Sequence, residues 1–582
     1  MTITANRQRA CLETAKRLIT HLINEGLVAA TLYHESQHNW LRIQNSPNHH
    51  SRDARVAELR VPLRNDAYVE TSPDDTVRNS SRVVFLKTGD LANQPVIVRV
   101  ADGENADDVE QSDPCAIFEI CIAELEVQPA MRDRILRQLG NSVDMQERWL
   151  EMSMSMPALN LDSPAIQWEQ SLIIGHPTHP FHKTCFAQPP LDPVHPGDLS
   201  RILAPDLAFI SLPATTVKVY GPIREVIKPL LEQLDIASEL GAFEKDRVVI
   251  PCLAQQLPAI KQCFPDIAVL NIVPNIADAQ ASIRTVSIKP SFNFPYHLKF
   301  ALSCEITSAL RIVPPWSVSE APGLSNVLQT LLPPDLWVYR EVAGVTGVQE
   351  DITEARQLGC IVREDVMPRA EQNGEALVMA AALIERPGQG TQTYAERLFG
   401  LNTLDRKRDW FRRYTRCLFQ LTLPPLVNYG IGLEAHGQNM VVRINKQTRS
   451  IQGFALRDLG GSRIHNLTFT AHKFKFDTLS RDKNPIFMDD ITAVWDRIHH
   501  VVLQNHVGYL MDALGLDKHG GWSIVREELK GVLNDGEESR GREVYEYFLK
   551  GEMAFKCFFK MRLADNTRHF IEKMVPNIVL RN

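Results

Sequence analysis

The segment from Leu433 to Ser462 constrains the fold of this chain more than any other stretch. Its sequence, LEAHGQNMVVRINKQTRSIQGFALRDLGGS, contains two alternating apolar runs, MVVRIN and SIQGFAL, on either side of a polar turn at 447–450. Such runs joined by a short polar turn predict an antiparallel β-hairpin. Pairing around this turn places Asn439 opposite Asp458, to within about one residue of register.

Polar side chains gather at the open end of this predicted hairpin. Glu434 and His436 lie just upstream of the first run and, being two residues apart, point to one face if that piece is extended. Arg457 stands beside Asp458. Oxygen-rich clusters of this kind hold Mg²⁺ together with nucleotide phosphates. A solvent-facing hairpin mouth would explain any one of these residues, but the set together favours a binding site.

Length and composition limit the class of protein. A chain of 582 residues is too long for one ordinary core, so roughly two to four domains are expected. A net charge of −7 argues against a nucleic-acid-binding body. Ten scattered cysteines without a CxxC pair predict reduced thiols in the cytoplasm. The longest apolar run, Leu377 to Ile384, cannot span a bilayer, and we expect no membrane association.

Periodicity predicts an α+β fold with large helical portions, in three parts. Strands are predicted at RVVFLK, PVIVRV, DRVVIP, AVLNIV and TVSIKP. After the hairpin the remainder is predicted to be helical, over ITAVWDRIHHVVLQNHVGYLMDAL and GREVYEYFLKGEMAFKCFFKMRLA. Further helices are predicted at Ala10–Glu25, Asp133–Met156, Ile223–Leu240 and Asp405–Leu421.

The stretch GHPTHPFHK, Gly175 to Lys183, is dense in histidine and proline. Its prolines favour a stiff extended loop over a helix. Such a loop could aim His176, His179 and Lys183 at an anion. A proline-rich surface loop with incidental histidines explains the composition equally well. Zinc is disfavoured, because zinc sites use closed ligand sets at recognised spacings, often with cysteine.

The stretch KFALSCEITSALR carries hydroxyls and cations at regular spacing. Hydroxyl donors and cationic groups suit phosphate oxygens. Steps of four residues would place four of them on one helical face, and even spacing would also keep them on one side of an extended chain. A buried amphipathic element is the alternative, and Arg340 with Glu341 could be an ordinary salt bridge. The candidate phosphate-binding residues are Lys299, Ser303, Thr307, Ser308 and Arg311.

The order Asn439…Asp458-Leu459-Gly460 is similar to the magnesium-binding order of protein kinases. No Gly-rich loop and no HRD motif precede it, and the chain has no Walker A loop and no GxGxxG, so a protein kinase is disfavoured. Two alternative functions remain open from the residues alone. One is a kinase-like phosphotransferase for a small molecule, and the other is a non-catalytic binding protein, whose ligand the resemblance described next would make citrate or a siderophore.

Taken in order, GHPTHPFHK, ITSALR, EAHGQN and RDLGG resemble the signature series of the NRPS-independent siderophore synthetases of the aerobactin type. The resemblance covers roughly residues 165–560. It implies a cupped-hand architecture, with a thumb over 1–160, fingers over 161–400 and a palm over 401–582. The chain departs from the family pattern after Lys183 and at Cys304 and Glu305, where more neutral residues are expected.

The activity implied by this resemblance is a two-step ligation. ATP and Mg²⁺ activate a carboxylate of citrate, or of a related acid, as an acyl-adenylate with loss of pyrophosphate. An amine, either a diamine such as putrescine or an amino acid derivative, then attacks to form an amide. The product would be a rhizoferrin-type bis-citryl diamine or a hydroxamate–citrate conjugate. The resemblance also implies a homodimer.

The resemblance also assigns roles to the motif residues. Glu434, Asn439 and Asp458 would bind Mg²⁺ and phosphate, and His436 would contact phosphate or the developing charge. His176, His179 and Lys183 would line the substrate side. The nucleotide phosphates or the carboxylate would be bound by Lys299, Ser303, Thr307, Ser308, Arg311 and Arg340.

Overall fold

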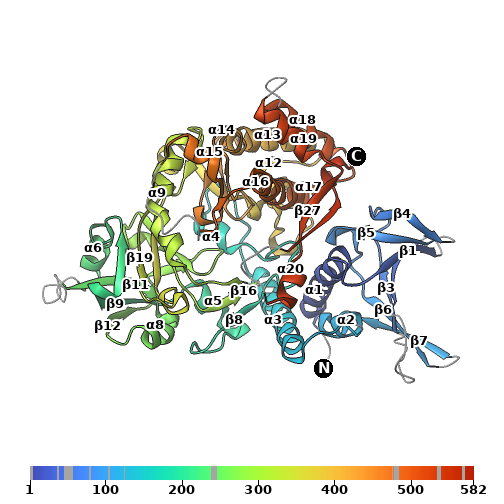
Figure 1. The fold of residues 1–582 in the computed structure, drawn as a ribbon, viewed down its shortest axis with the longest axis horizontal. Coiled ribbons are helices and arrows are strands. Elements are labelled where there is room, and N and C mark those ends of the chain that lie inside the picture. Colours follow the sequence, from blue (N-terminus) through green and yellow to red (C-terminus); the bar gives the residue numbers. More distant parts are fainter. Residues whose placement is uncertain are drawn as a thin grey trace.

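The computed structural model confirms the expected three-part α+β architecture. Figure 1 shows the N-terminal part in blue at one end, the middle part in green and yellow at the other, and the C-terminal part in orange and red between and above them. The structure describes residues 4–35, 38–44, 57–77, 80–102, 105–123, 125–236, 246–307, 309–474, 476, 484–533, 539–565 and 571–582.

The N-terminal part is a seven-stranded sheet with the strand order β4-β5-β1-β2-β3-β6-β7, backed by three helices. Alternate strand residues such as Leu41 and Leu59 are buried against Leu18 and Leu22 of α1 in one core. The predicted first helix is confirmed, and Thr4 caps it by accepting a hydrogen bond from the Arg7 N–H. The elements are α1 (Ala5–Asn24), β1 (Ala30–Glu35), β2 (His38–Gln44), β3 (Ala57–Pro62), β4 (Glu70–Val77), β5 (Ser80–Phe85), β6 (Val96–Asp102), β7 (Asn105–Gln111), α2 (Pro114–Cys121) and α3 (Pro129–Ser153).

The middle part combines a six-stranded sheet, β10-β19-β20-β15-β14-β13, with two smaller sheets, β11-β9-β12 and β17-β16-β8. Alternate residues of its central strands, such as Leu298 and Phe300, form one core with the flanking helices, while the residues between them include polar side chains such as His297 and Lys299. The elements are α4 (Ala165–Gln170), β8 (Cys185–Ala187), α5 (Leu199–Leu203), β9 (Leu207–Pro213), β10 (Val217–Tyr220), α6 (Ile223–Gln233), β11 (Arg247–Leu253), α8 (Leu257–Cys263), β12 (Ala268–Val273), β13 (Ala277–Ala279), β14 (Thr285–Ile288), β15 (Tyr296–Phe300), β16 (Cys304–Ile306), β17 (Ala309–Leu310), α9 (Pro315–Leu331), β19 (Glu341–Gly347), α10 (Ile352–Ala355), β20 (Gly359–Glu364) and α11 (Met367–Gln372).

The C-terminal part is built around the predicted hairpin, which is confirmed as β23 and β24. Met440 pairs with Leu456, so Asn439 lies opposite Arg457, one residue from the predicted partner, and the Arg457 N–H donates to the Asn439 carbonyl at 3.1 Å. The hairpin is the centre of a sheet with the order β18-β24-β23-β21. The elements are β18 (Leu336–Val338), β21 (Glu375–Met379), α12 (Tyr394–Phe399), α13 (Leu404–Thr422), α14 (Pro424–Tyr429), β22 (Ile431–Gly432), β23 (Met440–Asn445), β24 (Ile451–Leu456), β25 (Arg463–His465), α15 (Asn466–Ala471), β26 (Phe487–Met488), α16 (Ile491–Ile498), π-helix η10 (His499–Val507), α17 (Gly508–Ala513), α18 (Gly521–Leu533), α19 (Arg540–Phe548), β27 (Glu552–Lys556), α20 (Phe558–Leu563) and β28 (Glu572–Pro576).

One open alternative was decided by the structure, and one local prediction was wrong. The stretch from Lys299 to Arg311 is not one helical face, because β15, β16 and β17 carry it in extended form with a turn at Thr307. The segment GEMAFK is not helical either: it forms β27, which pairs with β28. In both stretches helical and strand periodicity compete over a short window, and pairing with a neighbouring strand decides the outcome.

The predicted domain boundaries at residues 160 and 400 remain predictions. Strands β18 and β21 precede residue 400, yet they pair with the hairpin in one sheet. Near the end of the chain, α20 returns to lie beside α1 of the N-terminal part (Figure 1). Each part of the chain therefore contributes elements to its neighbours, and this brings distant motifs together.

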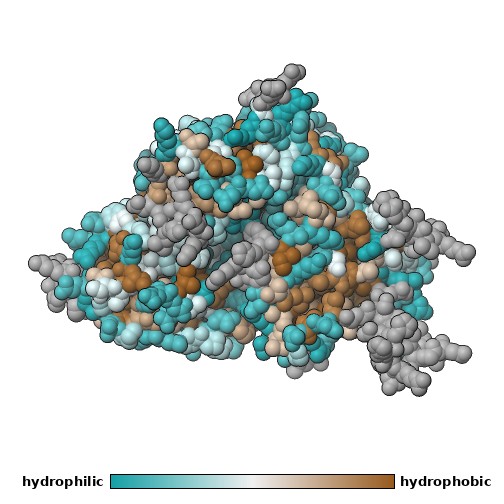
Figure 2. Space-filling view, viewed as in Figure 1, coloured by the Kyte–Doolittle hydropathy of each residue, from teal (hydrophilic) through white to brown (hydrophobic). Residues whose placement is uncertain are grey.

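The surface and the thiols agree with the limits set by composition. Figure 2 shows hydrophobic residues gathered mainly over the N-terminal part, while polar residues cover most of the remaining visible face. Across the described residues, no helix has both the length and the apolar character that crossing a membrane requires. All ten cysteines are free thiols.

Candidate active site

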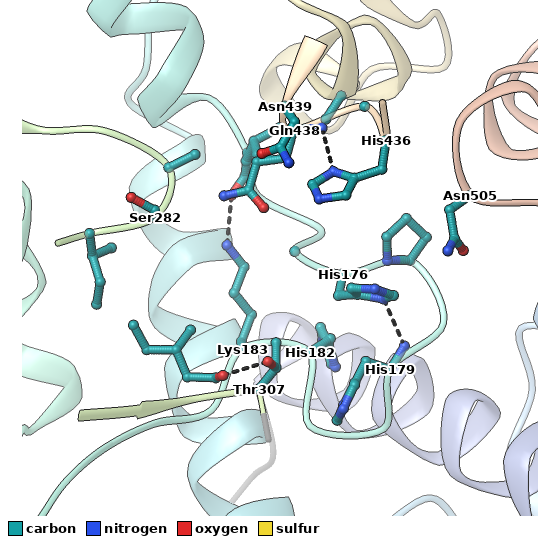
Figure 3. A pocket seen from close by; sticks show the side chains of 18 of the residues that line it. His176, His179, His182, Lys183, Ser282, Thr307, His436, Gln438, Asn439 and Asn505 are labelled. Atoms are coloured by element: carbon teal, nitrogen blue, oxygen red, sulfur yellow. Dashed lines mark hydrogen bonds between the residues drawn. The ribbon is translucent and has the colours of Figure 1, made fainter. Parts of the chain in front are cut away.

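A cavity of about 410 Å³ lies where the three parts meet, and this volume suits a small-molecule ligand. Its walls come from α3, from the loop 175–185, from the segments around β14 and β17, from the hairpin mouth, and from η10 and α20. Figure 3 shows His176, His436 and Asn505 around one space, with Thr307 near the base of Lys183 and Ser282 beyond the lysine. All four predicted motifs thus contribute to one cavity.

The loop of the first motif is held in shape by its own backbone. Gly175 has a φ of +73°, and a Cβ there would lie 2.7 Å from the His182 carbonyl oxygen. The His176 Nδ1 accepts hydrogen bonds from two backbone N–H groups, of Thr178 at 3.4 Å and of His179 at 3.2 Å. The His179 Nδ1 likewise accepts from the Phe181 N–H at 3.0 Å.

These bonds fix the tautomer of the two imidazoles. Because Nδ1 accepts, a neutral ring carries its proton on Nε2. Burial favours the neutral form: it lowers the pKa of His176 to about 3 and holds the pKa of His179 well below its usual value. His176 and His179 are therefore neutral Nε2–H donors in the wall of the cavity.

Lys183 also lines the cavity, but its ammonium is bound to the wall. The Nζ donates to the Leu172 carbonyl oxygen at 2.6 Å and lies 3.9 Å from the centre of the Trp149 ring. Burial lowers the pKa of Lys183 to about 7, and the nearby carboxylate of Glu385 opposes this shift. The lysine is thus poised between its charged and neutral forms.

In the second motif, Thr307 and Arg311 line the cavity. Arg311 donates to the Ile306 carbonyl oxygen at 3.2 Å and to Thr307 Oγ1 at 3.3 Å. Burial and the neighbouring Arg284 lower the pKa of Arg311 to about 10, which leaves it protonated at neutral pH. Ser308 lies outside the described residues.

Three predicted residues do not line the cavity. Ser303 is buried in an amide network, in which its N–H donates to Gln256 Oε1 at 2.7 Å and its hydroxyl bonds to Gln357. Arg340 forms a bidentate ion pair with Glu364. Lys299 is buried outside the cavity wall, where it forms an ion pair with Asp458.

Asp458 is the cavity residue of the RDLGG motif, and its backbone has a left-handed φ of +63°. Burial opposes its ionisation, but Lys299 and Arg284 outweigh burial and hold its pKa well below its usual value. Asp458 is therefore a carboxylate at any pH near neutrality.

The EAHGQN motif forms a hydrogen-bonded unit at the hairpin mouth. Glu434 makes a salt bridge to Arg497 at 2.7 Å, and this cation outweighs burial and holds the pKa of Glu434 below its usual value. The Asn439 Nδ2 donates to the Glu434 carbonyl oxygen at 3.1 Å, which turns its Oδ1 away from Glu434. The His436 Nδ1 accepts from the Gln438 N–H at 3.2 Å, and burial lowers the pKa of His436, so it is a further neutral Nε2–H donor.

The oxygen donors, not the histidines, form the candidate metal-binding set. Glu434, Asn439 and Asp458 all line the cavity and offer two carboxylates and a carboxamide. In the part of the chain that the structure describes, no three His, Cys, Asp or Glu side chains are arranged as a cluster that could hold a metal ion.

Sequence reasoning missed three cavity cations, Arg284, Arg497 and Lys556. Arg284 donates to the carbonyl oxygens of Arg311 at 3.0 Å and of Ile312 at 2.9 Å, which links it to the second motif. Lys556 ends β27, so reading its segment as a helix hid it. Alternation in GEMAFK was the available signal.

The π-helix η10 and the start of α17 contribute a second group of missed residues. The Asn505 Nδ2 donates to His500 Nε2 at 2.9 Å, and the Tyr509 hydroxyl lies 3.0 Å from Asn505 Oδ1 and 3.1 Å from Thr178 Oγ1. These contacts connect η10 to the loop of the first motif. π-Helical turns inside longer helices often occur at functional sites, and periodicity alone does not reveal them.

Two family descriptions match parts of this chain. Residues 264–385 match the IucA / IucC family, and residues 408–570 match the family described as ferric iron reductase FhuF-like transporter. The chain is also 39% identical over 574 residues to the NRPS-independent siderophore synthetase-like protein ankE of Aspergillus thermomutatus, covering 97% of this chain and 92% of that protein. The chain belongs to the NRPS-independent siderophore synthetase family.

More distant relatives of this siderophore synthetase agree with that assignment. The NRPS-independent siderophore synthetase rfs of Rhizopus delemar is 27% identical over 514 residues, with 85% of this chain and 79% of that protein covered. The D-ornithine–citrate ligase of Staphylococcus aureus is 24% identical over 340 residues, with 52% of this chain and 51% of that protein covered.

Solved structures share the fold of this siderophore synthetase. The petrobactin biosynthesis protein AsbB of Bacillus anthracis aligns with a TM-score of 0.79 at 18% identity, over 99% of this chain and 96% of that chain. ATP-bound aerobactin synthetase IucA of Klebsiella pneumoniae aligns with a TM-score of 0.71 at 16% identity, over 98% of this chain and 99% of that chain.

Proposed function

We propose that this siderophore synthetase uses ATP to activate a carboxylate of citrate as an acyl-adenylate, releases pyrophosphate, and condenses the activated acid with an amine to form an amide. The observation that carries this proposal is the meeting of all four motifs in one cavity. Family membership makes the chain a carboxylate–amine ligase. The names of two relatives, a citrate ligase and an ATP-bound synthetase, support citrate and ATP as substrates.

The cavity is suited to the first step because that step joins two anions. Attack of a carboxylate on the α-phosphorus needs cations and preorganised donors to offset the repulsion. Three arginines line the cavity, together with two lysines whose pKa values are lowered by burial: Arg284, Arg311 and Arg497, and Lys183 and Lys556.

The histidines contribute donors without adding charge. In this proposal the Nε2–H groups of His176 and His436 bind carboxylate or phosphate oxygens, and His179 supports the same side. Since their pKa values lie below neutrality, their donor role does not depend on pH near neutrality. Arg311 and Lys183, which line the same cavity, bind the anions as well.

The donor set at the hairpin mouth fits Mg²⁺. Glu434 and Asp458 are ionised and Asn439 presents its carboxamide oxygen, and such hard oxygen ligands are the ones Mg²⁺ prefers. When bound, Mg²⁺ would neutralise charge on the nucleotide phosphates. The pairing of Asp458 with Lys299 keeps that carboxylate in place and ionised.

The remaining predicted residues take supporting roles. Ser303 and Arg340 hold strands behind the cavity, and Thr307 offers a hydroxyl to the phosphates. Ser308 stays a predicted phosphate ligand. The amine partner, either a diamine such as putrescine or an amino acid derivative, also stays a prediction, as do the homodimer, the cytoplasmic location and the rhizoferrin-type product.

Pyrophosphate release by the purified protein tests the proposal. ATP, Mg²⁺ and hydroxylamine, as a surrogate nucleophile, would be combined with citrate, 2-oxoglutarate, succinate or no acid. We expect pyrophosphate and a hydroxamate that depend on citrate. Formation of ADP would instead indicate a phosphotransferase, and no nucleotide turnover with any acid would indicate a binding protein.

A further inference from the structure

A buried ion pair outside the cavity joins all three parts of the molecule. Glu305, on β16, pairs with Arg562, on α20, and their side chains are 4% and 1% exposed. Arg134, on α3, approaches the same carboxylate at 3.4 Å. We propose that Glu305 and Arg562 are positioning residues, which hold the first and second motifs in register; this inference rests on the proposed function.

On the Glu305 side, the pair fixes the strand that leads into the cavity. Thr307 follows Glu305 by two residues, and its N–H donates to the Thr184 carbonyl oxygen at 3.2 Å. β16 also pairs with β8, and in this pairing Ile306 of β16 lies opposite Cys185 of β8. Any movement of Glu305 therefore moves Thr307, and with it the hydroxyl that contacts Arg311.

On the Arg562 side, the same guanidinium lies against the loop of the first motif. Its central carbon lies 5.7 Å from the centre of the Phe181 ring, and Phe181 in turn contacts Phe559 with ring centres 5.9 Å apart. Arg562 thus contacts one motif through its charge and the other through an aromatic ring.

The helix that carries Arg562 also forms part of the cavity wall. Phe558 packs on His179 with ring centres 4.4 Å apart and on His176 at 5.6 Å. The opposite end of α20 is fixed by Glu25, whose carboxylate accepts from the N–H groups of Phe559 at 2.9 Å and Lys560 at 2.7 Å. Fixed at both ends, α20 sets where Phe558 meets the two histidines.

Physical chemistry favours a positional role over a purely stabilising one. Burying two charges costs desolvation energy that their attraction barely repays, so apolar residues of similar volume often give equal stability. What apolar residues cannot reproduce is the directional contact between carboxylate and guanidinium. The pair is therefore expected to matter more for catalytic geometry than for folding.

A double substitution separates the two roles. The variant Glu305→Leu/Arg562→Met replaces the pair by apolar groups, and we expect a melting temperature close to that of the wild type. We expect kcat/KM for citrate-dependent pyrophosphate release to fall about tenfold or more, since small misplacements of catalytic groups have large effects on rate. KM for ATP and citrate, kcat and the ATP affinity from calorimetry would be measured on the full chain.

Glu375 and Arg443 provide a matched control pair. They form a buried bidentate salt bridge between β21 and β23, outside the cavity wall. Glu375→Leu/Arg443→Met should keep wild-type kcat/KM and ATP affinity. Equal effects of the two double variants on kcat/KM and ATP affinity would overturn the positioning role. A wild-type protein that releases no pyrophosphate with any acid would instead contradict the proposed function.

Discussion

At the scale of single residues, the cavity depends on backbone conformations that most side chains avoid. Thr307 and Asp458 both have left-handed φ angles, of +58° and +63°. A β-branched residue in this region is rare, and such conformations cost roughly 1–3 kcal/mol each. Both residues face the cavity, so the surrounding strands hold them there at the expense of stability, as functional sites often do.

Gly461 is a second residue whose backbone serves the site. A Cβ at this position would lie 1.6 Å from Glu434 Oε2, so Gly461→Ala must displace that carboxylate. Because the end of a glutamate side chain can move, we expect the variant to fold normally. Its Mg²⁺ requirement for pyrophosphate release should rise about tenfold, as happens when the groups that orient metal ligands are altered.

The neighbouring glycine is the control for this prediction. A Cβ at Gly460 would meet Ser317 Oγ at 3.5 Å and Glu320 Oε1 at 3.7 Å, which are ordinary van der Waals contacts. Gly460→Ala should therefore titrate with Mg²⁺ as the wild type does. If the two alanine variants showed the same Mg²⁺ dependence, Glu434 would have no part in binding the metal.

At the scale of elements, the hairpin could be predicted and the second motif could not. MVVRIN and SIQGFAL are apolar runs on either side of a polar turn, so local sequence predicts their pairing, and the predicted register differed from the observed one by one residue. The stretch from Lys299 to Arg311 fits two periods at once, and its strands form only because β8, β14 and β20 lie beside them. Long-range pairing of this kind leaves no local signal.

Gly453 supports the hairpin at its contact with the neighbouring loop. Its φ is +148°, and a Cβ would lie 2.2 Å from the Asp335 carbonyl oxygen, a backbone atom that cannot easily move. We expect Gly453→Ala to lower the free energy of unfolding by about 1–3 kcal/mol through overpacking, in addition to backbone strain. Denaturant titration would measure this loss.

Gly400 is the comparison for this prediction. It ends α12 with a φ of +63°, and a Cβ there would have no atom within 4 Å. Gly400→Ala should cost only the strain of the left-handed backbone, about 1–2 kcal/mol. A loss of stability in Gly453→Ala no larger than in Gly400→Ala would mean that the contact with Asp335 relaxes freely.

At the scale of the whole molecule, the site could be recognised from its motifs but not assembled from them. Only the family resemblance predicted that the four motifs form one site, because no local sequence pattern indicates that residues 176 and 458 line the same cavity. The cations Arg284, Arg497 and Lys556 lie in segments without a motif, so only the fold identifies them. Only the fold also identifies the contacts that fix α20, namely the bond from the Phe559 N–H to Glu25 and the ion pair between Arg562 and Glu305.

The dense core of the C-terminal part also predicts how the molecule responds to acid. His499 and His506 are each 4% exposed, and burial lowers the pKa of both to about 4. An unfolded histidine has a pKa near 6.5, so the unfolded chain binds these protons first as the pH falls. The stability from the neutral rings is complete above about pH 6.5 and is lost as the pH falls towards 4, by roughly 2–3 kcal/mol for each ring.

His506→Gln tests this account most directly. The His506 Nδ1–H donates to the Ala435 carbonyl oxygen at 2.7 Å, and its Nε2 accepts from the Tyr414 hydroxyl at 2.7 Å. A glutamine side chain can also donate and accept hydrogen bonds, but it does not titrate. We expect the melting temperature of the variant to fall less steeply than that of the wild type between pH 6.5 and 4.5. The same change at the exposed His519 should leave the slope unaltered. If the melting temperature of His506→Gln depended on pH as steeply as that of the wild type, the acid sensitivity would come from other groups. The bond from His506 to the carbonyl of Ala435, which lies between Glu434 and His436, would then not depend on a neutral imidazole.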